Sequence, residues 1–351
     1  MNRLSCIRWI SFRKAELAKP PGSLGRLEDY AVQLAGIQGR SAPRAEKCRV
    51  LVFAGDNGVV AQGVSSAPQS VTVQQCINMT RHKTGMSAMA HHFGDSVVVT
   101  DVGINAPTPE GVVNRKVRWS TGDISREPAM TRQQAVDAMA AGMEAVERAN
   151  AEGVDIVGIG EMGIGNTTTS AAVLAVLTGA TVAQVCGRGG GLTDEAFAHK
   201  KAVINGAIRL HQPCKEDILD TLSKVGGLDI AAMCGAFIGC AVHHLPAVVD
   251  GYISIVAALC AARLCPAVKD VIFLSHASFE IGYQLAASEL GQVPPLGLGM
   301  RLGEGSGCVV MFRVLEAACA AMNEMATFSQ AAINDDYLAD IRKGDAFTVT
   351  P

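Results

Sequence analysis

The stretch Asp155–Gly179, DIVGIGEMGIGNTTTSAAVLAVLTG, decides the fold class of this chain. It begins with a short apolar run, continues through a glycine-rich segment and ends in an apolar segment rich in alanine and leucine. This order predicts a buried strand, a loop and a helix. The loop also carries Asn166 and three threonines, residues that cap helix N-termini and donate hydrogen bonds to anions.

The same order of strand, turn and helix recurs on both sides of this stretch. It is found at Arg49–Gly58, Ser96–Asn105, Ala247–Leu264 and Val271–Leu290. Repeated strand–helix units predict a mostly parallel sheet, and runs that are apolar at successive positions are expected where helices cover both faces. We therefore predict an α/β fold with a doubly wound, Rossmann-like sheet.

The two ends of the chain lack this order. Residues 11–40 and 312–345 have mainly helical patterns without the strand and glycine turn. We expect residues 1–40 and 312–351 to form a smaller helical domain built from both chain ends. Residues 41–311 are then the large α/β catalytic domain.

Composition narrows the function classes. Hydrophobic residues make up 49% of the 351 residues, so the chain can bury a substantial core. Lys and Arg number 30 against 33 Asp and Glu, and this balance argues against a nucleic-acid-binding surface. The longest uncharged run, Ile230–Val249, contains two histidines and a proline, so we expect a buried helix and strand there and no membrane segment.

The cysteines and histidines indicate neither a disulfide framework nor a metal site. Eleven cysteines form no C-x-x-C pair, and most of them lie in apolar runs where thiols act as small core residues. A reducing cytoplasmic location is the simpler interpretation. The adjacent pairs His91-His92 and His243-His244 point to different faces of a helix or strand, so they do not converge on a metal.

Four glycine-rich segments are candidates for binding an anion, with phosphate as the expected one, because glycine lets backbone N–H groups approach a ligand closely. They are Lys19–Glu28, Gly158–Ser170, Gly187–Glu195 and Arg301–Gly307. The second is the strongest candidate but is no Walker A loop, because Asn166 stands where that motif needs lysine. Gly158, Gly160 and Gly163 match the dinucleotide fingerprint, which leaves a dinucleotide-dependent oxidoreductase as a minor alternative.

Charged side chains in and near these segments suggest the chemistry. Glu304 lies between Gly303 and Gly305, and Glu161 follows Gly160. Each could act as a general base whose pKa is raised by burial. Arg188 and Arg301 suit phosphate or carboxylate recognition, and one lysine of the Lys200-Lys201 pair can reach back to the site. Three further candidates follow apolar strands and could equally be turn or structural residues: Asp56, Asp101 and His276.

Taken together and in order, these segments closely resemble the nicotinate-nucleotide–dimethylbenzimidazole phosphoribosyltransferase family. The matching stretches are KPPGSLGRLE, FAGDNGVV, PQSVTVQQ with INMT, GIGEMGIGNTTT, GRGGGLTDE, KVGGLDI, VVDGYIS, SHASFE and RLGEGSG. The match runs from Lys19 to beyond Glu316. GEMGIGNTT and RLGEGSG are highly specific in combination.

The resemblance implies that nicotinate mononucleotide gives its phosphoribosyl group to 5,6-dimethylbenzimidazole or a related base. The products are nicotinate and α-ribazole 5′-phosphate, used in assembling the nucleotide loop of cobalamin. The resemblance also implies a homodimer. It implies no cofactor and no metal.

The resemblance further implies a role for each residue that matches a family motif. Glu304 is the general base and Glu161 the carboxylate on the ribose side. Asn166 and Gly303 belong to the substrate-binding loops, and the small Ala67 leaves the preferred base open. Gly163 and Gly189 make backbone contacts to the nucleotide. Lys200, Arg301 and Ser278 contact the phosphate or a carboxylate, and Ser278 reaches across from a second subunit. The base pocket is formed by Gln75, Met162 and Leu302.

A catalytically inactive nucleotide-binding homologue is the other alternative. Such a protein would keep the glycine-rich loops and lose turnover. Glu304 argues against it, because an added negative charge does not help phosphate binding.

Overall fold

A computed structural model describes residues 3–338 of the chain. The chain divides into two compact units, one made of Met1–Glu46 with Phe312–Pro351 and the other of Lys47–Met311. We call them the small unit and the large unit. The expected division at residues 40 and 312 stays a prediction about domains, because compactness alone does not show that either unit folds independently.

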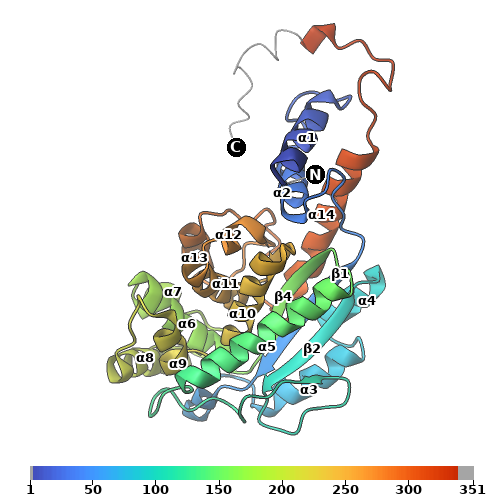
Figure 1. Cartoon of the computed structure of the whole chain (residues 1–351). Coiled ribbons are helices and arrows are strands. Elements are labelled where there is room, and N and C mark those ends of the chain that lie inside the picture. Colours follow the sequence, from blue (N-terminus) through green and yellow to red (C-terminus); the bar gives the residue numbers. More distant parts are fainter. Residues whose placement is uncertain (1–2, 339–351) are drawn as a thin grey trace. The chain divides into compact units, whose positions relative to one another are not determined.

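The large unit contains one parallel sheet in the order β3-β2-β1-β4-β5-β6 (Figure 1). Every neighbouring pair of strands is parallel, and the order reverses direction between β1 and β4. This is the doubly wound α/β arrangement, so the predicted fold class is confirmed. The strands are β1 (Cys48–Gly55), β2 (Ser96–Gly103), β3 (Val113–Asn114), β4 (Ile156–Met162), β5 (Ala247–Val249) and β6 (Ile272–Leu274).

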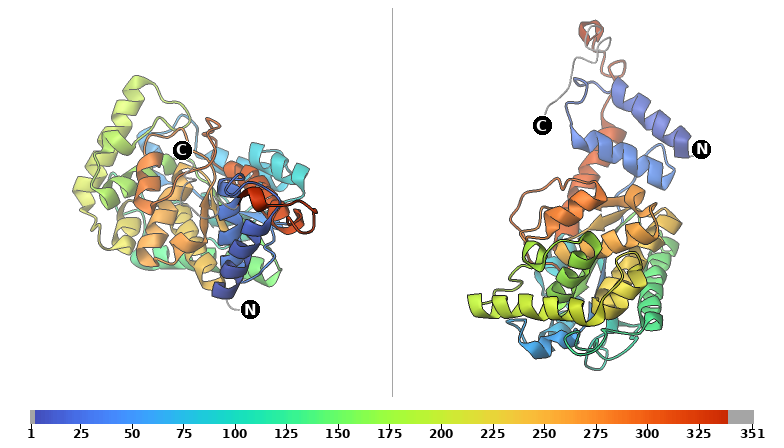
Figure 2. Two further views of the ribbon diagram at one scale, coloured as in Figure 1. Left: turned by 90° about the horizontal axis from the view of Figure 1, so that it is seen from above. Right: turned by 90° about the vertical axis from the view of Figure 1, so that its left-hand side faces the viewer.

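Every residue of β1 and β4 is buried, because helices cover both faces of the central strands. Figure 2 shows further views of the same ribbon. The helices of the large unit are η1 (Gly58–Gln62), α3 (Ser70–Thr80), α4 (Gly85–Phe93), α5 (Arg132–Ala151), α6 (Asn166–Thr178), α7 (Val182–Val185), α8 (Asp194–His211), α9 (Ile218–Val225), α10 (Leu228–His243), α11 (Tyr252–Leu264), α12 (Val268–Val271) and α13 (Tyr283–Leu290). The final long helix, α14 (Ser306–Glu324), begins in this unit and continues into the small one.

Helices α6, α7, α8 and α9 pack against one another beside the sheet, and Figure 1 shows them in green to yellow. On the sheet itself, α10 packs on β1, β2 and β4, and α11 packs on β4 and β5. Close contact between α5 and α10 depends on glycine: a Cβ at Gly142 would lie 1.9 Å from the carbonyl oxygen of Ala232. The core of the large unit therefore lies between this sheet and its helices.

The small unit is helical in its described part. It contains α1 (Arg3–Glu16), α2 (Arg26–Gln38), most of α14 and the short η2 (Asp336–Leu338). Residues from the two chain ends meet here, since the Phe328 N–H donates to the Glu16 carbonyl over 3.0 Å. The residues beyond 338 that belonged to the expected helical domain lie outside the described part.

The uncharged run Ile230–Val249 forms most of α10 and all of β5, as expected from the sequence. Among the described residues, α14 is the one helix that is long and apolar enough to cross a membrane by length and composition. Just over half of that apolar window, 56%, is buried in the protein, as in the core helices of many water-soluble proteins.

Candidate active site

A cavity of about 310 Å³ lies at the carboxyl ends of the strands, where doubly wound sheets bind their ligands. It is lined by the end of β4 and by the segments that follow η1, β5 and β6. Eleven of the twelve candidate site residues line it, and the twelfth, Lys200, contacts the lining residue Thr167. The eleven are Gln75, Glu161, Met162, Gly163, Asn166, Gly189, Ser278, Arg301, Leu302, Gly303 and Glu304.

The backbone of Glu304 adopts a conformation that side-chain-bearing residues rarely take. Its φ is +63°, between Gly303 at +80° and Gly305 at +86°. A Cβ at Gly160 would lie 2.6 Å from the Gly305 nitrogen, so glycine in β4 allows this loop to approach the strand. A strained residue in a closely packed loop is typical of a functional position.

The carboxylate of Glu304 is buried at the cavity wall. Its Oε1 accepts a hydrogen bond from Gln75 Nε2 at 3.2 Å, while its Oε2 is buried and has no partner in the described part of the chain. Burial raises the pKa of Glu304, the Gln75 and Thr84 side chains lower it, and the nearby Asp250 raises it further. One carboxylate oxygen of a cavity-lining residue is therefore left without a hydrogen-bond partner among the described residues.

Asp250 anchors the loop that carries Glu304. This side chain is 1% exposed and follows β5. Its Oδ2 accepts the Gly305 N–H at 2.9 Å, and its Oδ1 accepts the Gly307 N–H at 2.6 Å. The neighbouring His276 is also buried, and burial raises the pKa of Asp250 and lowers that of His276.

Glu161 and Asp229 form a second buried acidic pair, bridged by Asn166. The Asn166 Nδ2 donates to Glu161 Oε2 and, at 2.9 Å, to Asp229 Oδ2. Burial raises the pKa of Glu161 to about 8 and that of Asp229 to about 6. The hydrogen bonds from the Asn166 amide lower both pKa values and so partly offset these shifts, which allows the two carboxyl groups to lie close together.

The Glu161→Gln variant should gain stability relative to the unchanged protein as the pH rises. A carboxyl whose pKa is raised by folding stabilises the folded state fully below its unfolded pKa, near 4.5, and loses that contribution as the pH rises through its folded pKa, about 8. Urea unfolding at pH 5 and pH 8 should therefore show a relative gain of about 2 kcal/mol or more for the variant. Glu147→Gln, at an exposed position on α5, is the control, and parallel changes in all three proteins would contradict the expectation.

Lys200 and the glycine loop 187–191 form a cationic end of the site. Lys200 is 1% exposed, and its Nζ donates to Thr167 Oγ1 at 2.8 Å. A Cβ at Gly189, whose φ is +56°, would lie 3.1 Å from the same Thr167 oxygen. A buried ammonium beside the opening of α6 suits an anionic group of a ligand.

Ser278 lines the cavity of its own chain, and its expected reach across to a second subunit stays a prediction. Two other sequence expectations are corrected by the structure. Gly158 and Gly160 lie inside β4, whereas a dinucleotide fingerprint places its glycines in the turn after the strand. In Lys19–Glu28 the terminal residues form a buried ion pair of 2.6 Å within the small unit, which gives this segment a structural role.

The remaining candidates lie at or outside the edge of the cavity. Arg188 pairs with Asp194 and stacks on Phe197, and Lys201 also lies over that ring. His276 lines the cavity. Asp56 and Asp101 are buried beyond it, with Asp56 accepting from the Asn105 backbone and Asp101 paired with Lys116.

Three residues of the site were not singled out from the sequence: Asp229, Asp250 and Glu280. Asp250 follows an apolar strand, the same signal that pointed to Asp56 and Asp101. Asp229 stands in the first turn of α10, two residues after Gly227 in the matching stretch KVGGLDI.

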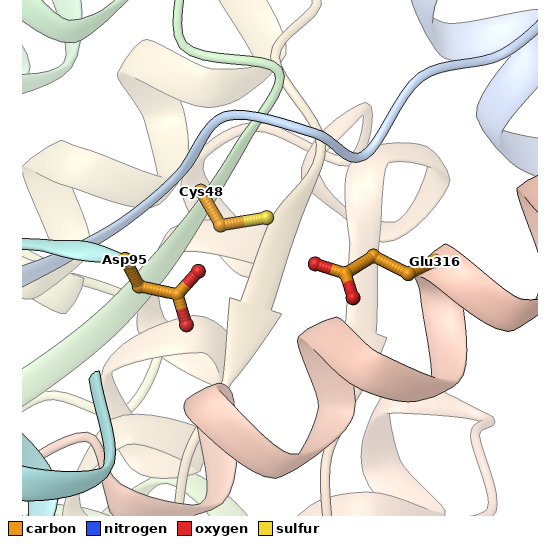
Figure 3. A group of neighbouring side chains, drawn as sticks. All are labelled: Cys48, Asp95 and Glu316. Carbon is orange, nitrogen blue, oxygen red and sulfur yellow. The ribbon is translucent and has the colours of Figure 1, made fainter. Parts of the chain in front are cut away.

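The side chains of Cys48, Asp95 and Glu316 are drawn in Figure 3. Cys48 and Asp95 belong to the large unit, whereas Glu316 belongs to the small one. Among residues 3–338, no three His, Cys, Asp or Glu side chains of a single unit converge as metal ligands would.

Comparisons with known proteins agree with this site. Residues 6–333 match a family model described as phosphoribosyltransferase. Nicotinate-nucleotide–dimethylbenzimidazole phosphoribosyltransferases from Clostridium perfringens and Clostridium tetani are 48% and 43% identical, over 96% and 94% of this chain and 94% and 92% of theirs. The crystal structure of CobT from Thermus thermophilus is 37% identical, with a TM-score of 0.89 over 94% of this chain and 99% of that one. This chain therefore belongs to the nicotinate-nucleotide–dimethylbenzimidazole phosphoribosyltransferase family.

Proposed function

We propose that this protein transfers the phosphoribosyl group of nicotinate mononucleotide to 5,6-dimethylbenzimidazole or a related base. The products are nicotinate and α-ribazole 5′-phosphate, a precursor of the cobalamin nucleotide loop. The names of its relatives supply the reaction class. The observation that carries the proposal is the buried Glu304 carboxylate, whose unpartnered oxygen belongs to a residue of the cavity wall, together with the buried Lys200, which donates to the lining residue Thr167.

Glu304 acts as the general base. The benzimidazole places its N–H against Glu304 Oε2, and its other nitrogen attacks C1′ of the ribose. As the new C–N bond forms, the bond from C1′ to the nicotinate nitrogen breaks and its electron pair returns to the pyridine ring. The benzimidazole proton passes to Glu304, so charge and atoms balance, and the leaving group needs no acid because it departs from a pyridinium.

The rest of the cavity positions the two substrates. Lys200, Arg301 and the Gly189 loop receive the phosphate, because they place two cations and backbone donors at one end. Glu161, held by Asn166, faces the ribose. Attack from the side opposite the leaving group inverts C1′, which turns a β-nucleotide into an α-riboside and requires both substrates to be bound at once.

The apolar part of the cavity receives the base. Met162 and Leu302 provide apolar contact for the flat base, and Gln75 orients Glu304 through its hydrogen bond. Ala67 lines the same cavity with a small side chain, which leaves the preferred base open. The mechanism uses protein side chains alone, and the absence of a cofactor and a metal requirement stays a prediction.

Chromatography of the purified protein incubated with nicotinate mononucleotide and a panel of bases tests the proposal. The panel contains dimethylbenzimidazole, adenine and a phenol. We expect nicotinate to appear together with an α-riboside phosphate whose identity follows the added base. Folded protein that binds the nucleotide but releases no nicotinate with any base would overturn the proposal in favour of an inactive nucleotide-binding homologue.

We also propose that the protein is a cytoplasmic homodimer. Apolar side chains near the cavity mouth, Phe279, Ile281 and Leu302, are more than half exposed, and such a group is typical of a surface that a second copy covers. All eleven cysteines are free, as expected in a reducing compartment. Light scattering coupled to size-exclusion chromatography should give twice the 36.6 kDa mass of the chain, and a monomer would contradict the dimer.

A further inference from the structure

Glu280 lies between the substrate cavity and a second cavity of about 410 Å³. It follows β6 and lines both spaces. Its Oε2 is buried without a hydrogen-bond partner in the described part of the chain. The transfer chemistry above gives this carboxylate no task, and a third acid near a phosphate site needs a physical reason.

The glycine loop is built around this carboxylate. A Cβ at Gly187 would lie 1.7 Å from Glu280 Oε2, so the carboxylate rests directly against the Gly187 α-carbon. Gly189 lines both the substrate cavity and the second cavity together with Glu280. Gly189 and Gly191 have φ values of +56° and +108°, a conformation with few internal hydrogen bonds to maintain it. Glu280 therefore supports the glycine loop 187–191 by packing against it.

Two cations, Lys200 and Arg301, influence the ionisation of this carboxyl group. Burial lowers the pKa of Lys200, and nearby Cys186 and Glu280 act in the opposite direction. Burial raises the pKa of Glu280, while Lys200 and Arg301 lower it.

We propose that Glu280 is a positioning residue for the donor nucleotide's phosphate. It packs against Gly187 and lines the cavity beside Gly189, and so it holds the glycine loop in its receiving arrangement before the nucleotide arrives. This inference rests on the proposed function, because it takes the anion to be the phosphate of nicotinate mononucleotide. Glu280 acts on the nucleotide through the glycine loop.

Two variants separate the packing of this side chain from its charge. Glu280→Ala removes the side chain that packs against Gly187, and we expect it to raise KM for nicotinate mononucleotide at least about 10-fold, with kcat and KM for the base within about 3-fold. Glu280→Gln keeps a side chain of the same size without the charge, and its KM should stay within about 3-fold. Glu289→Gln, on α13 and paired with Arg263 away from both cavities, is the matched control.

Amide hydrogen exchange provides a readout that needs no turnover. In the free protein, the peptide covering residues 186–193 should exchange about 10-fold faster in Glu280→Ala than in the unchanged protein, and close to normally in Glu280→Gln. An active unchanged enzyme whose Glu280→Ala variant keeps its nucleotide KM would overturn the inference. So would a Glu280→Gln variant as impaired as Glu280→Ala. If the unchanged enzyme releases no nicotinate with any base, the proposed function itself fails.

Discussion

Replacing Glu304 by Gln is expected to lower kcat by about 10²- to 10⁴-fold, the usual range for loss of a general base. Gln keeps the size of the side chain and its hydrogen bond with Gln75, but the amide cannot take the proton of the benzimidazole. Because the phosphate end of the cavity is unchanged, binding of nicotinate mononucleotide should stay within about 3-fold. Single-turnover release of nicotinate measures the first effect, and calorimetric titration with the nucleotide measures the second.

The pH dependence of the rate of the unchanged enzyme should reflect the ionisation of Glu304. Glu304 must be ionised to accept a proton, and burial raises its pKa above the ordinary 4.5. The rate should therefore fall on the acidic side at a pH above 4.5, and the residual rate of Glu304→Gln should lack that fall. Glu195→Gln, exposed on α8, is the control. Normal turnover by the Glu304→Gln variant would refute the assignment of the base.

The fold could be predicted from short segments because its defining features are local. A run such as Ile156–Gly160 in β4 is apolar throughout, and such runs are typical of a strand covered on both faces. A glycine turn and a helix follow within a few residues, so the strand–helix unit is readable without knowledge of its neighbours. The order of strands in the sheet depends on pairings far apart in the chain, such as Cys48 with Ile156, and no local pattern encodes it.

The candidate site was predictable where its residues stand in glycine-rich loops. Glu161 and Glu304 could be predicted as site residues because little local packing explains a carboxylate beside glycines. Their supports were missed, because Asp250 acts on backbone N–H groups more than fifty residues away and Glu280 acts on a loop nearly a hundred residues before it. The expected reach of Ser278 across to a second subunit stays a prediction, because one chain does not show how two copies are placed.

Replacing Asp250 by Ala is expected to damage both stability and turnover. The change leaves the N–H groups of Gly305 and Gly307 without acceptors inside the protein, and hydrogen bonds to a charged group contribute about 1.5–3 kcal/mol each. The free energy of unfolding should therefore fall by about 3 kcal/mol or more. Because the same bonds keep Glu304 in its left-handed conformation, kcat should fall on the order of 10²-fold in protein that is still folded.

Asp250→Asn separates anchoring from charge. Its amide oxygen still accepts one of the two N–H groups, but its NH₂ faces the other, so stability and kcat should fall between those of the unchanged protein and Asp250→Ala. Urea unfolding gives the stability, and circular dichroism at the assay temperature confirms that the protein measured is folded. A folded Asp250→Ala variant with normal kcat would show that Glu304 keeps its position without this anchor. Loss of kcat at unchanged nucleotide affinity would place the damage at the Glu304 loop, because Lys200 and the glycine loop do not depend on Asp250.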